Sequence, residues 1–192
     1  MSVFNIYFDL GLEHILALAG LDHIIFIIIL CAIYLMSDWK KVLILVTAFT
    51  IGHTITLGLA TFQVIKVNSS LVEFLIPLTI FITALSNIFL GDRSKMKVNV
   101  NYYLALFFGL IHGLGFSNSL RGLLGKNDDF AIKLLGFNLG LEVGQIVIVM
   151  AFLLVSFLFV DVFKASRRDW RLVISSLGAG IAILLMIQNK FW

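Results

Sequence analysis

The stretch GLEHILALAGLDHIIF, residues 11–26, decides the fold, because it begins a long apolar run yet carries several ionisable side chains. His14, Asp22 and His23 fall within ten residues of one another. A charged side chain at the bilayer centre costs about 3 kcal/mol or more unless it is paired or hydrated. The stretch therefore predicts a membrane-inserted helix whose polar residues serve a function.

The composition of the whole chain agrees with a membrane protein. Of its 192 residues, 60% are hydrophobic and only 13% are charged, whereas soluble domains are about 45–50% apolar. The net charge of +3 comes from basic residues in short gaps between apolar runs, which indicates membrane orientation and not nucleic-acid binding. The sequence has no GxGxxG or GxxxxGK nucleotide-binding motif.

Six apolar runs approach the roughly 20 residues that a helix needs to cross a bilayer. They cover residues 13–36, 42–64, 71–90, 101–120, 132–160 and 171–189. The gaps between them are short, so residues 1–192 are expected to form one transmembrane domain. The predicted fold class is an all-α polytopic membrane helical bundle of about six transmembrane helices.

The basic residues predict the orientation of this bundle. Nine of the 14 Lys and Arg residues lie in or beside the first, third and fifth connections, and five lie on the opposite side. Positively charged loops stay in the cytoplasm. We therefore expect both termini on the outer side of a bacterial inner membrane.

Ionisable residues within the predicted spans are the candidates for a functional site. All four histidines of the chain lie inside these runs, and the predicted orientation places them, with two carboxylates, between the outer surface and the bilayer centre. We expect them to converge on a metal-binding cavity open to the outside. The candidate metal ligands are His14, Asp22, His23, His53, His112 and Glu142.

The geometry of the first span needs a bend for this convergence. Nine residues separate His14 from His23, which places them on opposite faces of an ideal helix. Gly20, or a re-entrant start before it, is the predicted point of reorientation.

Two further patterns predict helix packing. Gly136, Gly140 and Gly144 form a GxxxGxxxG ridge that lets another helix approach closely. The polar stripe of Thr47, Thr50 and Thr54 beside His53 is interpreted as packing and back-bonding to the helix, more than as metal ligation.

The donor set suits a divalent transition metal. Imidazole and carboxylate bind Ni²⁺, Co²⁺, Zn²⁺ and Fe²⁺, and the lack of a Cys or Met cluster argues against Cu⁺. The single Cys31 lies inside an apolar run, so there is no disulfide framework.

Four blocks together resemble the HupE/UreJ family of small bacterial membrane proteins. The blocks are HILALAGLDHIIF (14–26), VTAFTIGHTITL (46–57), LIHGLGFSNSL (110–120) and LLGFNLGLEVGQ (134–145). Hydrogenase-associated members usually begin the first motif with His-Pro, but Ile15 follows His14 here, so the chain looks closer to a second branch of the family.

The resemblance implies a nickel or cobalt permease. It implies His14, Asp22 and His23 as signature metal residues, and His53, His112 and Glu142 match the later blocks. The expected partners are membrane lipid and a divalent metal ion, with nickel, cobalt and zinc all open, and the sequence also leaves a homo-oligomer open.

The residues leave a second function open, an intramembrane zinc-dependent hydrolase acting on a lipid or membrane peptide. Asp22 or Glu142 would serve as general base, and Ser117 or Asn118 would stabilise an oxyanion. A metal sensor or accessory subunit with a static site is a third interpretation.

Overall fold

The computed structural model describes residues 2–17, 20–65, 67–89, 98–124 and 129–192, with the backbone alone at 98–100 and 118–124. Its helices are α1 (Val3–Leu16), α2 (Leu21–Cys31), η2 (Met36–Asp38), α3 (Trp39–Thr61), α4 (Ser69–Phe89), α5 (Val98–Leu124), α6 (Phe130–Phe157), η4 (Leu158–Val162) and α7 (Arg167–Gln188). No strand occurs in these described parts of the chain. The predicted all-α polytopic bundle is confirmed.

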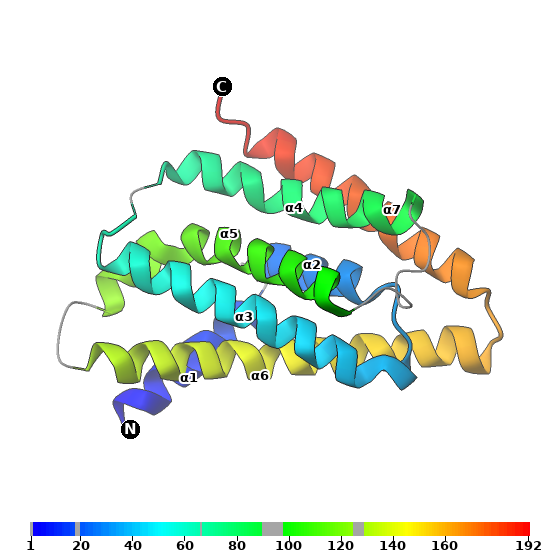
Figure 1. The fold of residues 1–192 in the computed structure, drawn as a ribbon, viewed down its shortest axis with the longest axis horizontal. Helices are drawn as coiled ribbons and strands as arrows, with labels where there is room; N and C mark the ends of the chain where they lie inside the picture. Colours follow the sequence, from blue (N-terminus) through cyan, green and yellow to red (C-terminus); the bar gives the residue numbers. More distant parts are fainter. Residues whose placement is uncertain (1, 18–19, 66, 90–97, 125–128) are drawn as a thin grey trace.

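Within the described ranges, four helical segments are long and apolar enough to cross a membrane. They are Met36–Thr61, Ser69–Phe89, Phe130–Val162 and Arg167–Gln188, and there are five if the bent pair of α1 and α2 is counted as one broken span. Helix α5 covers the run predicted at 101–120. Successive helices run back and forth along the bundle, so both termini lie in the left half of Figure 1.

The first predicted span differs from the structure in two ways. It is two helices, not one, and α1 begins at Val3, ten residues before the predicted start. The Ser2 hydroxyl accepts a hydrogen bond from the Asn5 N–H at 3.3 Å and so caps the helix. Packing against α6 then stabilises a segment whose own sequence gave no strong membrane signal.

Close contact between α1 and α6 depends on small residues, as the glycine ridge predicts. A Cβ at Gly140 would meet the carbonyl of Phe8, and a Cβ at Gly11 would meet the carbonyl of Phe137. The two backbones therefore touch where α1 crosses the first half of α6 (Figure 1).

Helices α3 and α5 pack in the same manner. A Cβ at Gly109 would meet the carbonyl of Phe49, and one at Gly113 would meet the carbonyl of His53 and the hydroxyl of Thr56. Helix α5 is continuous through these glycines, so they serve tight packing and do not interrupt the helix.

Pro77 lies inside α4 and removes the backbone donor that would bond the carbonyl of Glu73. The side-chain amide of Asn189, just beyond α7, donates to that carbonyl at 3.2 Å instead. The end of α7 is thereby tied to the kink-prone part of α4.

Replacing Gly140 by alanine is expected to lower the thermal stability of the purified protein. The added methyl group overlaps the Phe8 carbonyl, and overpacking of this kind costs about 1–3 kcal/mol. Gly180→Ala is the matched control, because a Cβ at Gly180 meets nothing within 4 Å. Equal melting temperatures for the two variants would contradict the α1–α6 contact.

Candidate metal centre

The four histidines come from four different helices and gather around His23. The ring centre of His23 lies 5.0 Å from those of His14 and His112, and 6.1 Å from that of His53. His14, His23 and His53 each offer a ring nitrogen, and these three atoms lie within 4.8 Å of one another. Imidazoles this close can share one metal ion after small side-chain rotations.

A break in the chain brings His14 and His23 to one side, as predicted. Helix α1 ends at Leu16, α2 starts at Leu21, and the two are inclined by 68°. Gly20 lies directly against the backbone carbonyl of His14, where a Cβ would not fit. The bend thus needs glycine at position 20 for a close approach of the backbone.

His53 and His112 are brought together by the glycine contacts of α3 and α5. Both side chains are fully buried, and His23 is only 3% exposed. Because Gly113 follows His112 and packs on the carbonyl of His53, the two helices approach at the level of the cluster. Their packing fixes the depth of both imidazoles.

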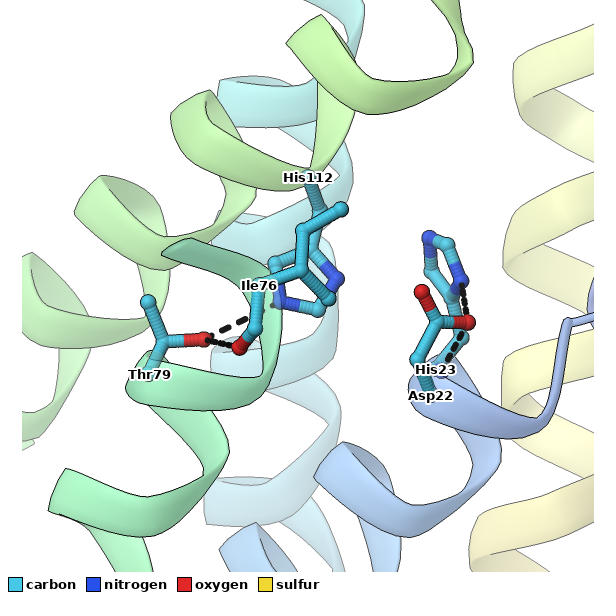
Figure 2. Close-up of polar contacts among 5 residues, drawn as sticks. All are labelled: Asp22, His23, Ile76, Thr79 and His112. Carbon is cyan, nitrogen blue, oxygen red and sulfur yellow. Dashed lines mark hydrogen bonds and ion pairs between the residues drawn. The ribbon is translucent and has the colours of Figure 1, made fainter. Parts of the chain in front are cut away.

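Asp22 fixes the tautomer of His23. The Nδ1 of His23 lies 2.9 Å from Oδ1 of Asp22, and Figure 2 shows this bond. A carboxylate accepts hydrogen bonds, so Nδ1 carries the proton and donates. In a neutral imidazole the other nitrogen, Nε2, then has a free lone pair, which is the arrangement seen in histidine ligands of metals.

Thr79 fixes the tautomer of His112 by a different route. The Thr79 hydroxyl donates its one proton to the carbonyl of Ile76 at 2.7 Å. It also lies 3.1 Å from Nε2 of His112, so at that contact it accepts from an Nε2–H group (Figure 2). The Nδ1 of His112 is therefore the atom with the free lone pair.

These free nitrogens are buried without hydrogen-bond partners among the described residues. The unpartnered atoms are His14 Nε2, His23 Nε2, His53 Nδ1, His53 Nε2 and His112 Nδ1. Buried polar atoms are nearly always hydrogen-bonded, so a cluster of unpartnered ring nitrogens indicates that a ligand binds between them. The lone pairs on His23 and His112 make that ligand a proton donor or a metal cation.

Aromatic rings enclose the cluster. The Phe116 ring lies 3.8 Å from that of His14, and the Phe26 and Phe49 rings lie 5.2 and 5.1 Å from that of His112. Phe137 stacks on Phe116 at 5.3 Å. This apolar wall lowers the local dielectric, which strengthens the interaction of the site with a charged ligand.

Glu142 lies apart from the histidines. Its Oε1 accepts a hydrogen bond from the Thr47 hydroxyl at 2.7 Å, and both residues line a groove of ≈ 490 Å³ between α3 and α6. The neighbouring Thr50 donates to Gln145 at 2.8 Å. Thr47 and Thr50 of α3 thus bond to polar side chains of α6, while Thr54 donates to the carbonyl of Thr50 at 2.7 Å, which is the predicted back-bonding.

The residues predicted to support hydrolysis are placed less favourably. The Ser117 hydroxyl donates to the carbonyl of Leu114 at 2.7 Å, so its proton is already committed. The side chain of Asn118 lies outside the described part of the structure.

Sequence reasoning missed Thr79, although a signal for it exists. Thr79, Thr83 and Asn87 recur every four residues in α4, which places them on one helix face. A stripe of this kind opposite a buried histidine predicts a partner for its ring.

Comparison with models of known protein families matches residues 1–190 to the family described as HupE / UreJ protein. Searches of curated proteins and of solved structures found no match to this chain.

Proposed function

The chain belongs to the HupE/UreJ family, and from this membership we propose that its histidine cluster binds a divalent transition-metal ion and passes it across the membrane. The observation that carries the proposal is the set of buried, unpartnered imidazole nitrogens on α1, α2, α3 and α5, where His14, His23 and His53 each offer a ring nitrogen within 4.8 Å of the other two. Nitrogen donors of this kind suit Ni²⁺, Co²⁺ and Zn²⁺. The proposed location is the bacterial cytoplasmic membrane.

Asp22 is the proposed first contact for an incoming cation. Its side chain is 28% exposed while that of His23 is 4% exposed, so the carboxylate stands between the surroundings and the buried rings. The same carboxylate holds the proton of His23 on Nδ1. One residue thereby attracts the metal ion and keeps the central nitrogen ready for it.

A route from the cluster toward the predicted inner side is offered by α4 and α5. Thr79 touches His112, and Thr83 and Asn87 continue on the same face over eight residues, or about 12 Å. Half of a bilayer core is about 15 Å. Thr83, Asn87 and Asn101 line a cavity of ≈ 170 Å³, which supports an exit path along this face.

Uptake of radiolabelled Ni²⁺, Co²⁺ and Zn²⁺ into proteoliposomes tests this function directly. We expect time-dependent accumulation of at least one of the three above the level of protein-free liposomes. Metal that binds to the purified protein but never enters the vesicles would overturn transport. One zinc ion that survives dialysis together with absent uptake would favour the static or hydrolytic site.

Thr79→Val is expected to weaken metal binding by roughly 10–100-fold, the usual cost of losing a group that orients a metal-binding histidine. Valine keeps the shape of threonine but cannot accept the Nε2–H of His112. Isothermal titration of the purified protein with each metal measures the change. Thr61→Val is the control, because the buried Thr61 hydroxyl likewise donates to a backbone carbonyl, that of Leu57 at 2.8 Å, and lies outside the proposed route. Equal losses in both variants would contradict the role of Thr79 in fixing the tautomer.

A further inference from the structure

A second cavity lies away from the histidines, where the segment after α2 meets the start of α7. It has a volume of ≈ 210 Å³ and is lined by Arg167, Arg168, Trp170 and Arg171 on one side and by Ile33 and Leu35 on the other. This cavity sits at the end of the membrane-spanning helix Arg167–Gln188. Its depth is therefore that of the boundary between lipid tails and headgroups.

The cavity contains hydrogen-bond donors without acceptors. The Nε of Arg171 and the indole Nε1 of Trp170 are both buried and lack a partner among the described residues. No carboxylate among the described residues forms an ion pair with Arg167, Arg168 or Arg171. A buried N–H group is rarely left unsatisfied, so these donors indicate an acceptor that binds from outside the chain.

The placement of the arginines also favours an anion. They occupy the first turns of α7, the end of a helix where the backbone dipole disfavours cations and favours anions. Arg167 and Arg171 are four residues apart, so two like charges share one helix face, which is destabilising. The acidic residue of the first turn, Asp169, is exposed and forms no ion pair with them.

Trp170 is held rigidly at this position. Its ring stacks on that of Phe159 at 5.3 Å and lies 5.8 Å from that of Phe152. The indole N–H is thereby fixed in direction, and the ring packs against the hydrophobic core of the bundle. Tryptophan at this level is typical of residues that contact lipid headgroups.

We propose that this cavity binds a phosphate group, of the kind carried by an anionic phospholipid. Guanidinium groups form paired hydrogen bonds with phosphate oxygens, and the Trp170 N–H supplies a further donor. Ile33 and Leu35 give an apolar wall for the start of the acyl chains. Basic pockets between transmembrane helices bind anionic headgroups in this manner, and the site is independent of the proposed metal transport.

The test measures the melting temperature of the full-length protein in a neutral detergent with added lipid. Phosphatidylglycerol is expected to raise it by roughly 3–5 °C at saturation, and phosphatidylcholine with the same acyl chains by less. Arg171→Gln and the more exposed Arg167→Gln are expected to lose most of the increment. Lys40→Gln is the matched control, since Lys40 is an exposed basic residue beside Trp39 and outside the cavity.

Each outcome decides the proposal. Equal shifts with the two lipids, or an undiminished phosphatidylglycerol shift in both arginine variants, would overturn it. The same measurement with added inorganic phosphate distinguishes a lipid headgroup from the free phosphate ion. A shift with inorganic phosphate that requires Arg167 and Arg171, without one from phosphatidylglycerol, would support the phosphate site and assign it to the free ion.

Discussion

His23→Ala is expected to abolish high-affinity metal binding, with a loss of well over 100-fold. His23 is the one ring with close contacts to all three other imidazoles, so its removal takes away the ligand that the others surround. Even the loss of a group that merely orients a ligand costs about 10–100-fold. Equilibrium dialysis with Ni²⁺, Co²⁺ and Zn²⁺ measures the binding, and uptake into proteoliposomes should fall to that of protein-free vesicles.

The matched control for His23→Ala is Cys31→Ala. Cys31 lies on the same helix, is fully buried and is itself a common metal ligand, but it packs in the apolar core with Ile27 and Val46. We expect this variant to bind metal as the wild type does. Metal affinity in His23→Ala close to the wild-type value, with an unchanged melting temperature, would contradict a centre organised around His23.

The convergence of the histidines could be predicted from the sequence because it depends on how deep each histidine lies in the membrane. Positions along a helix convert directly into height in the membrane at 1.5 Å per residue. On that basis the four histidines fall between the outer surface and the bilayer centre, and the structure brings their rings together. The bend at Gly20 was predicted from helix rotation, since nine residues place His14 and His23 on opposite faces of an unbroken helix.

The rotation of each helix could not be predicted in this manner. Asn138, Glu142 and Gln145 share one stripe of α6, yet that stripe is wide enough to face both α3 and the groove beside it. Gln145 bonds to Thr50 and Glu142 bonds to Thr47. Which partner each residue meets depends on the crossing of α6 with α1 and α3, and this crossing is set by contacts far apart in the sequence.

The start of α1 could not be predicted from the sequence for a related reason. Residues 3–12 include Asn5 and Asp9, which weaken their apolar signal. Their helix is stabilised by the glycines of α6, more than 120 residues later in the chain. The composition of residues 3–12 gives no sign of this contact. The GxxxGxxxG ridge predicted that some helix packs closely on α6, but not that this helix is α1.

Asp22→Asn and Glu142→Gln form the pair that separates the two predicted carboxylates. Asp22→Asn is expected to weaken metal binding by roughly 10–100-fold. An amide is a weaker acceptor than a carboxylate for the Nδ1–H of His23, and its NH₂ group can turn toward Nδ1 and move the imidazole proton to Nε2. Titration of both purified variants with Ni²⁺, Co²⁺ and Zn²⁺ gives the comparison.

Glu142→Gln should leave the affinity close to that of the wild type, because the glutamine side chain can still accept the Thr47 hydrogen bond and this contact lies outside the group of facing imidazoles. An equal loss in both variants would mean that Glu142 leaves Thr47 and turns toward the metal when the ion binds. A loss in Glu142→Gln alone would remove Asp22 from the centre and contradict the assignment of the His23 tautomer.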